Sequence, residues 1–388
     1  MNKRIVSELT RVGLTTAVVT AALLTTARLL PQVAHQGLAP EPTAKLHVES
    51  IGPLELTGSM GVAINDKNEV VGTAFGDDEV RAFVVRGRKG ELLPLPKGAP
   101  FSAAAGINAK GEIVGIAGSE DTVRGTVWLG NKPGVLTSGK RDTMATTLSG
   151  NSVAAGVAFD NQGRTLNPLA AENVATMLVG SEDGTHFSPD RFASWNHLLD
   201  QKWDNGFSGM LWSKPGDGKS IGEFVPQSGN AAGTLVGLAM SKNGPAPAAF
   251  KNGRIGTLPS PEGVQMAVPM AANAKEVFVG AGLTGERVVK PVGWLNGKTG
   301  LLPVPGDRQG LALGINDSNQ VVGVIETESG EAHAAVWSGG KVIDLNDAVD
   351  QREGWTLVQA RGINNKGFVV GTGIKDGHVG AFVVGPIK

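Results

Sequence analysis

The amino-acid sequence predicts an all-β fold built from repeated four-stranded units, and three observations support this prediction. A motif of about ten residues recurs along the chain at a period near 43 residues. Glycine fills 56 of the 388 positions, about twice its usual share of roughly 7%, which is typical of a chain with many tight turns. An ordinary repeat also contains no helix-period run of apolar residues long enough for a helix.

The motif reads as a strand, a tight turn and a second strand. It closes on a glycine at Gly72, Gly115, Gly237, Gly280, Gly323 and Gly371, and a degraded copy closes at Gly156. An asparagine stands seven residues before each clean closing glycine: Asn65, Asn108, Asn230, Asn273, Asn316 and Asn364. Asn at the first position and Gly or Asn at the fourth is typical of a type I turn followed by a residue with positive φ. We therefore interpret the six asparagines as structural turn residues, with Glu276 as the one departure at the fourth position.

Two further strands complete each repeat. An aromatic residue follows the closing glycine by eleven to fourteen residues, at Phe83, Trp128, Phe250, Trp294, Trp337 and Phe382. A short run rich in Leu and Val comes next, such as GELLPLP from Gly90 or KVIDLN from Lys341. Four short strands in about 43 residues match one blade of a β-propeller. Because the aromatic residues recur in register with the blades, we expect them in the core.

The middle of the chain leaves the number of blades open. Gly156 and Gly237 lie 81 residues apart with no clean motif between them, and the irregular region covers about residues 157–210. It is either a blade whose motif is degraded, which makes eight blades, or an insertion of about 40 residues in a seven-bladed ring. The run from Gly209 to Trp212 resembles a third strand within this region.

The two ends of the repeat region are predicted to pair with each other. The last repeat supplies three strands and no fourth. Residues 45–51 precede the first motif and alternate apolar with polar side chains, as a half-buried strand does. A ring left open would expose strand edges that invite aggregation. We therefore expect residues 45–51 to pair with residues 380–384 and to close the propeller.

These repeats resemble those of the bacterial extracellular HAF repeat family. The resemblance is most specific at GINDSNQVVG with AAVWSGGKVIDLN, and at GINNKGFVVG with GAFVV, and it covers roughly residues 46–388. It implies secretion and a repetitive all-β fold. It implies no known chemistry, and it supplies no catalytic residues to carry over.

The N-terminal segment predicts export. Lys3, Arg4 and Arg11 precede an uncharged stretch from Val12 to Ala27 that ends in small residues. This pattern is typical of a secretory signal peptide, and the stretch is short for a membrane-spanning helix. Residues 1–27 are thus a signal peptide or an N-terminal anchor, residues 28–44 a linker, and residues 45–388 the propeller. The expected location is extracellular or periplasmic.

Composition narrows the classes of function. The formal net charge is −1, from 35 basic and 36 acidic residues, so there is no overall electrostatic attraction for nucleic acid or an anionic membrane. We predict contact with a membrane only through the N-terminal segment, if it stays uncleaved. Cysteine is absent, which excludes disulfides and thiolate chemistry.

Motifs for catalysis and for metal binding are weak. The six His residues are scattered, and the Asn-Asp turns lack the ligand pattern of a calcium loop. We therefore predict no catalytic residue, no metal site and no cofactor. Trp195, His197 and Trp203 fall outside the regular motif, so blade packing does not explain them, and they are the candidate binding residues.

Three functions remain open at this stage. The first is an exported non-catalytic scaffold that presents loops to an unknown partner or ligand. The second is a secreted propeller enzyme that acts on carbohydrates or lactones through acidic residues such as Asp344, Asp347, Asp350 and Glu353. The third is a structural protein of the cell envelope.

Overall fold

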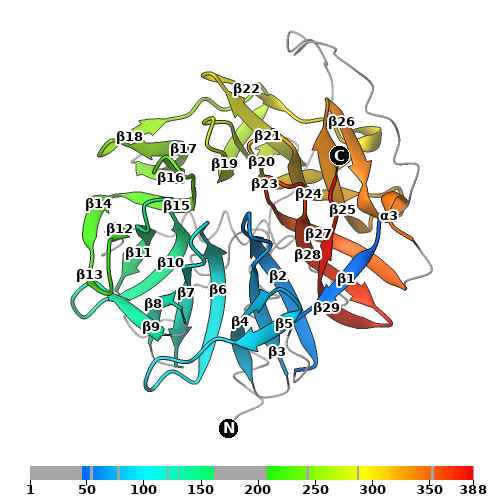
Figure 1. Cartoon of the computed structure of the whole chain (residues 1–388). Coiled ribbons are helices and arrows are strands. Elements are labelled where there is room, and N and C mark those ends of the chain that lie inside the picture. The colour runs from blue at the N-terminus through cyan, green and yellow to red at the C-terminus, as the bar shows by residue number, and fades with distance from the viewer. Residues whose placement is uncertain are drawn as a thin grey trace.

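Seven antiparallel sheets surround a central axis like the blades of a propeller (Figure 1). The computed structural model describes residues 46–387, apart from 53–55, 77–78, 120–121, 131, 161–207, 242–243, 286–287 and 351–353. The all-β propeller is confirmed, and the ring has seven blades. In each blade the innermost strand is here called strand a, and strands b, c and d follow outward; they also follow one another in sequence, except that strand d of blade 7 comes from the N-terminal end of the chain (Figure 1).

The strands of blades 1 to 3 have the following bounds. Blade 1 contains β2 (Gly58–Ile64), β3 (Val70–Phe75), β4 (Val80–Arg86) and β5 (Lys89–Leu92). Blade 2 contains β6 (Phe101–Ile107), β7 (Ile113–Gly118), β8 (Val123–Leu129) and β9 (Lys132–Thr137). Blade 3 contains β10 (Asp142–Leu148), β11 (Ala154–Phe159), β12 (Ser208–Trp212) and β14 (Lys219–Gly222). The two-residue β13 (Gly216–Asp217) pairs with β9.

Blades 4 to 7 continue the ring. Blade 4 contains β15 (Phe224–Gly229), β16 (Leu235–Ser241), β17 (Gly244–Lys251) and β18 (Arg254–Thr257). Blade 5 contains β19 (Val264–Ala272), β20 (Phe278–Thr284), β21 (Val289–Leu295) and β22 (Lys298–Leu301). Blade 6 contains β23 (Gly310–Ile315), β24 (Val321–Glu326), β25 (Ala332–Ser338) and β26 (Lys341–Asp344). Blade 7 contains β27 (Trp355–Ile363), β28 (Val369–Lys375), β29 (His378–Val384) and β1 (Val48–Ile51).

The described helices are one turn each. The 3₁₀-helix η3 (Pro305–Asp307) precedes blade 6, and α3 (Leu345–Ala348) follows it. Among the described residues, no helix has the length and apolar character to cross a membrane.

The irregular middle region is an insertion within blade 3. Strand b of this blade ends at Phe159 and strand c begins at Ser208. The blade also packs directly on blade 4, since the Thr146 hydroxyl donates a hydrogen bond of 2.7 Å to the Pro226 carbonyl. The chain between the two strands therefore adds no eighth blade to the ring.

The N-terminal strand closes the ring as the sequence predicts. β1 pairs antiparallel with β29, from Val48 opposite Val384 to Ile51 opposite Ala381. Val48 and Ile51 are buried, whereas Glu49 and Ser50 between them are exposed, so the strict alternation expected from the sequence breaks at Ser50. Leu46 bonds separately to the end of α3, because its amide donates to the Ala348 carbonyl at 2.9 Å.

The closing glycine of every motif is required by a bulge in strand a. Each a–b pair shifts register by one residue, for example between Ala312 and Gly314 in blade 6, and a bulge of this kind bends the strand locally. A Cβ built on Gly323 would lie 2.0 Å from the Leu311 carbonyl oxygen. The other six closing glycines meet a strand a carbonyl at similar distances. Only glycine fits there, which explains why the motif ends on it.

The repeated tryptophans connect neighbouring blades. The indole N–H of Trp337 donates to the Pro303 carbonyl at 2.6 Å, at the end of the preceding blade. Trp128 and Trp294 make the same bond to the carbonyls of Pro94 and Pro259. Phe83, Phe250 and Phe382 occupy the equivalent positions in blades 1, 4 and 7 and are buried. The aromatic residues thus belong to the core, and the tryptophans add a polar contact between blades.

Candidate functional site

The propeller presents two faces with different connections. Because adjacent strands in a blade are antiparallel, the a–b turns and c–d hairpins lie on one face, and the b–c and d–a connections lie on the other. We call them the a–b face and the b–c face. The insertion in blade 3 joins strands b and c, so it leaves from the b–c face. Trp195, His197 and Trp203 lie outside the described residues and stay a prediction.

The asparagine turns form a hydrogen-bonded ring on the a–b face. Each side-chain oxygen accepts bonds from two amides of its own turn, as the Asn316 Oδ1 does from Ser318 and Gln320 at 3.0 Å. The fourth residue of each turn has positive φ: Asn68, Gly111, Ser152, Gly233, Glu276, Asn319 and Gly367. Glu276, which breaks the sequence rule, therefore keeps the turn geometry at φ 59°.

The amide groups of five of these asparagines bond to the next blade, whereas that of Asn108 donates to the Glu112 carboxylate in its own turn at 2.6 Å. The Nδ2 of Asn65 donates to the Asn108 carbonyl at 3.0 Å, and that of Asn364 donates to the Asn65 carbonyl at 2.9 Å. Equivalent bonds run from Asn230 to Asn273, from Asn273 to Asn316 and from Asn316 to Asn364. Blade 3 has Ser149 at this position, and there the Gly150 amide donates to the Asn230 carbonyl at 3.4 Å.

A second layer of polar groups covers part of this ring. The amide nitrogen of the Asn365 side chain bonds to both Asp66 and Asp317, at 3.0 Å each. The backbone amide of Asp317 donates to the side-chain oxygen of Asn365, and the backbone amide of Asn365 donates to the Asp66 carboxylate, both at 2.8 Å. These carboxylates are thus held by blade-to-blade bonds, and the layer stabilises the ring.

The b–c half of the propeller holds an apolar cluster to which all seven blades contribute. Its members lie just after the closing glycine in strand b, as do Ile116, Val157, Leu238, Ala281 and Val324. Others begin strand c, as do Val80, Val123, Val289 and Ala332, or lie in strand a, as do Phe101, Met144, Val225, Met270, Leu313 and Val358. Ala103, Phe159, Met240, Met266 and Ile374 are only partly buried against it.

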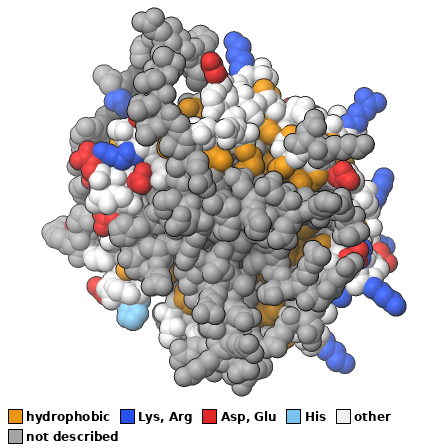
Figure 2. Space-filling model, turned by 180° about the vertical axis from the view of Figure 1, so that it is seen from behind, with side chains coloured by type: hydrophobic (Ala, Val, Ile, Leu, Met, Phe, Trp, Pro, Cys, Tyr) orange, Lys and Arg blue, Asp and Glu red, His pale blue; other side chains and the backbone are white. Residues whose placement is uncertain are grey.

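Figure 2 shows how side chains are distributed on the face seen from behind. Patches of hydrophobic side chains are visible beside the undescribed residues, and many of the charged side chains lie at the periphery. A polar rim around an apolar centre is typical of surfaces that bind a partner. The partly buried members of the apolar cluster are therefore the described residues that best fit a binding site.

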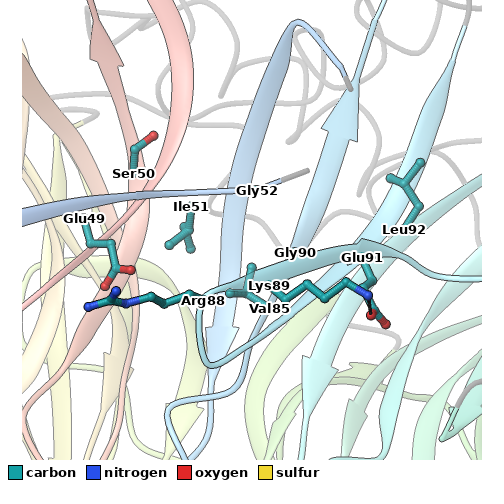
Figure 3. Close-up of a pocket in the computed structure, with 10 residues that line it drawn as sticks. All are labelled: Glu49, Ser50, Ile51, Gly52, Val85, Arg88, Lys89, Gly90, Glu91 and Leu92. Carbon is teal, nitrogen blue, oxygen red and sulfur yellow. Dashed lines mark hydrogen bonds and ion pairs between the residues drawn. The ribbon is translucent and has the colours of Figure 1, made fainter. Parts of the chain in front are cut away.

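A groove of about 520 Å³ lies at the outer seam between the closing blade and blade 1 (Figure 3). Residues Glu49 to Gly52 of the β1 segment form one side, and Arg88 to Leu92 form the other. The Glu49 carboxylate and the Arg88 guanidinium point toward one another across it (Figure 3). Lys89 and Glu91 form an ion pair at 2.5 Å. The groove is thus polar, open and at the place where the ring closes.

One histidine has a specific acidic partner. The His333 Nδ1 and the Asp344 Oδ2 lie 2.5 Å apart. This hydrogen bond raises the pKa of His333 above its usual value of 6.5, and burial of the ring opposes the increase only in part. The other oxygen of Asp344 accepts from the Asn346 amide and caps α3. The pair therefore anchors the segment between blades 6 and 7. In the described ranges, no group of three or more His, Asp or Glu side chains is placed to hold a metal ion.

The fold and the ring define the chain as a closed, seven-bladed β-propeller. No family model and no curated protein matches it. It is similar to virginiamycin B lyase from Staphylococcus aureus, with 11% identity over 87% of this chain and 99% of that chain, and a TM-score of 0.45. It is also similar to the propeller domain of the Trilobed protease from Pyrococcus furiosus, with 8% identity over 85% and 94% of the two chains and a TM-score of 0.48. A gluconolactonase from Xanthomonas campestris shares 10% identity over 87% and 89%, with a TM-score of 0.39. At these identities the similarity concerns the fold alone.

The bonds between asparagines of successive blades and the apolar cluster were both missed by sequence reasoning. The interblade bonds had a signal, because the same amide recurs at one position in six repeats. The cluster had one too, in the apolar residue that follows most closing glycines. Read one repeat at a time, these residues indicate a turn and a strand; the closed ring is what brings them together.

Proposed function

We propose that the protein is an exported, non-catalytic scaffold that binds a protein partner at the b–c face. The observation that carries this proposal is the apolar cluster, which runs through all seven blades and leaves Phe159, Met240 and Ile374 partly exposed. Most of the cluster is buried, and the partly exposed apolar side chains at its edge are the ones that a partner would contact. Export is supported by the charge and length pattern of the N-terminal segment.

The charge around the cluster indicates the chemistry of the partner. Strand b of blade 6 ends at Glu326, and the b–c connection after it carries Glu328, which pairs with Arg308, and Glu331. Asp344, which bonds to His333, and Asp347 follow the same blade. A partner segment with apolar side chains flanked by basic ones complements this surface, because opposite charges steer encounter and fix orientation.

The test uses Nile red, an uncharged probe of apolar surface, with the full-length protein. Met240→Glu combined with Ile374→Glu should remove most of the probe fluorescence. The matched control is Ile255→Glu with Leu295→Glu, at exposed apolar residues of the c–d hairpins, and should change it little. Equal fluorescence from both variants would show that the cluster is not accessible.

A second experiment concerns the insertion. Replacing residues 161–207 with a short turn should leave a folded ring, because the b–c pairing of β11 with β12 spans its two ends. Native near-ultraviolet circular dichroism with loss of partner binding would support a recognition role. Unfolding of the ring would favour a structural role. Turnover of a lactone or a glycoside by the full chain would refute the non-catalytic scaffold.

A further inference from the structure

The c–d hairpins of blades 1 to 6 carry a marked excess of positive charge. Their basic residues are Arg86, Arg88, Lys89, Lys132, Lys214, Lys219, Lys251, Arg254, Lys298 and Lys341. In the described part of the same hairpins, the acidic residues are Glu91 and Asp217. We call this set of basic residues the basic rim.

Most of the basic rim is exposed and carries no ion pair. Arg86, Lys89 and Lys251 pair with Glu69, Glu91 and Glu276 respectively. No such pair within the described residues involves the remaining members, which are all exposed: Arg88, Lys132, Lys214, Lys219, Arg254, Lys298 and Lys341. Each of blades 2 to 6 therefore contributes at least one exposed cation that forms no ion pair with a described residue, and in blade 1 Arg88 faces the Glu49 carboxylate (Figure 3).

The fold places these cations on one face. Every c–d hairpin lies on the a–b face, at the outer part of its blade, so the basic rim follows the circumference of a disc (Figure 1). The b–c connections carry mainly acidic residues, including Glu79, Asp160, Glu326, Glu328, Glu331 and Asp376. Three of these acids, Glu79, Asp160 and Glu328, pair with Arg81, Arg141 and Arg308. The net charge of −1 thus conceals an uneven distribution, with the cations of the c–d hairpins gathered on the a–b face, and such asymmetry orients a protein in an external field.

Protection of sheet edges explains only part of this pattern. Strand d is the outer edge of each blade, and a lysine on an edge strand prevents pairing with other chains. Either sign of charge serves that purpose. Yet β5, β9, β14, β18, β22 and β26 all begin with Lys or Arg. The constant sign points to an anionic partner.

We propose that the a–b face docks on an anionic lipid surface through the basic rim. The cations lie along six of the seven blades, and the turns inside them are closed by hydrogen bonds between blades. A linear polyanion would reach only a few blades at a time, whereas a flat membrane meets all of them. Lys and Arg near an anionic bilayer each add to such binding, and salt screens it.

This orientation leaves the two faces of the disc to different partners. Docking in this way leaves the b–c face, with its apolar cluster, directed away from the lipid.

The test is flotation of the full-length protein with vesicles. Vesicles of phosphatidylcholine and phosphatidylglycerol should bind the protein at low salt and release it at high salt, and vesicles of phosphatidylcholine alone should not bind it. Lys298→Gln with Lys341→Gln should weaken binding about thirtyfold, if each lysine contributes about 1 kcal/mol. The matched control, Lys97→Gln with Lys140→Gln on the d–a connections, should bind as the unchanged protein does.

Several results would overturn the proposal. Equal, salt-insensitive binding to both kinds of vesicle would assign membrane contact to apolar insertion. Binding to heparin without binding to vesicles would assign the rim to a soluble polyanion. If the Lys298 and Lys341 variant aggregates but binds anionic vesicles at full strength, these lysines protect strand edges and do no more.

Discussion

The side-chain amide of Asn364 donates a hydrogen bond of 2.9 Å to the backbone carbonyl of Asn65, 299 residues earlier in the chain. This bond joins blade 7 to blade 1 near the axis, and the pairing of β1 with β29 joins the chain ends at the outer rim. The ring is thus closed both near its axis and at its outer rim. A closed ring should unfold cooperatively, unlike an open array whose end repeats fray.

Replacement of Asn364 should show how much this inner closure contributes. Asn364→Ala removes two bonds within the turn and the bond to Asn65, and it leaves buried backbone groups without partners. We expect a loss of about 2 kcal/mol in the free energy of unfolding, measured with urea.

Asn364→Ser is the matched control, because blade 3 already has Ser149 at this position. A serine oxygen still accepts bonds within the turn but cannot reach the next blade, so we expect a loss of about 1 kcal/mol. If Ser and Ala have the same effect, the side chain acts only through the bond between blades.

Removal of β1 should destabilise the ring at its outer seam. A chain that begins at residue 56 lacks the buried Val48 and Ile51 and exposes β29 as an edge. We expect the melting temperature to fall by roughly 10 °C, from the apolar area lost. A chain that begins at residue 45 keeps β1 and should melt like the full chain. Equal melting of the two chains would contradict closure by this strand.

The sequence predicts the repeats, the order of the strands and the closing strand because each depends on local pattern. An Asn-initiated turn and a period-two strand are visible within a few residues. The pairing of residues 45–51 followed from counting strands at the two ends. What local pattern leaves open is the insertion, since Gly156 and Gly237 are separated by nearly two repeat lengths. Only the packing of blade 3 on blade 4 decides between seven and eight blades.

The candidate site was less accessible to such reasoning. The apolar cluster combines one or two residues from each blade, so no single segment shows it. The basic rim is hidden in the net charge for the same reason. Lys298 and Lys341 are 43 residues apart, and they become neighbours in the ring only when blades 5 and 6 pack together.

Substitution of a closing glycine should be far more damaging than substitution of an exposed one. In Gly323→Ala the new methyl group would meet the Leu311 carbonyl oxygen, and the backbone of strand a cannot move without breaking its pairing. We expect a loss of about 3 kcal/mol or more in chemical unfolding. Gly256→Ala in β18 is the control, because a Cβ there meets nothing within 4 Å; stability should hold or rise slightly. Similar losses at both sites would argue against the close contact as the cause.

The bonds from tryptophan to proline carbonyls between blades should be measurable by comparison with Trp355. Trp337→Phe removes the donor to Pro303, whereas the buried Trp355 indole N–H has no hydrogen-bond partner among the described residues. Both substitutions remove the same atoms from the side chain, because each replaces an indole by a phenyl group. We therefore expect Trp337→Phe to cost about 1 kcal/mol more than Trp355→Phe in urea unfolding. An equal cost would show that only the lost packing matters.

Stability should depend on pH through His333. Its hydrogen bond to Asp344, with smaller contributions from the charges of Asp344, Glu331 and Asp347, raises the pKa of the imidazole in the folded protein. The protonated form is therefore favoured by folding. Its contribution is complete below about pH 6.5, the value for an unfolded chain, and it is lost as the pH rises through the folded-state pKa.

His333→Gln tests this linkage. The difference in unfolding free energy between the unchanged protein and the variant should be largest near pH 5 and smaller near pH 9, well above the pKa of an ordinary imidazole. Asp344 also caps α3, and Leu46 bonds to the Ala348 carbonyl in that helix. The Leu46 amide should therefore be better protected against hydrogen exchange in the unchanged protein than in the variant, and this difference should be larger near pH 5 than near pH 9. His378→Gln, at an exposed hairpin of blade 7, is the control and should leave the pH profile unchanged. A pH-independent difference for His333→Gln would mean that the imidazole contributes by packing, without its charge.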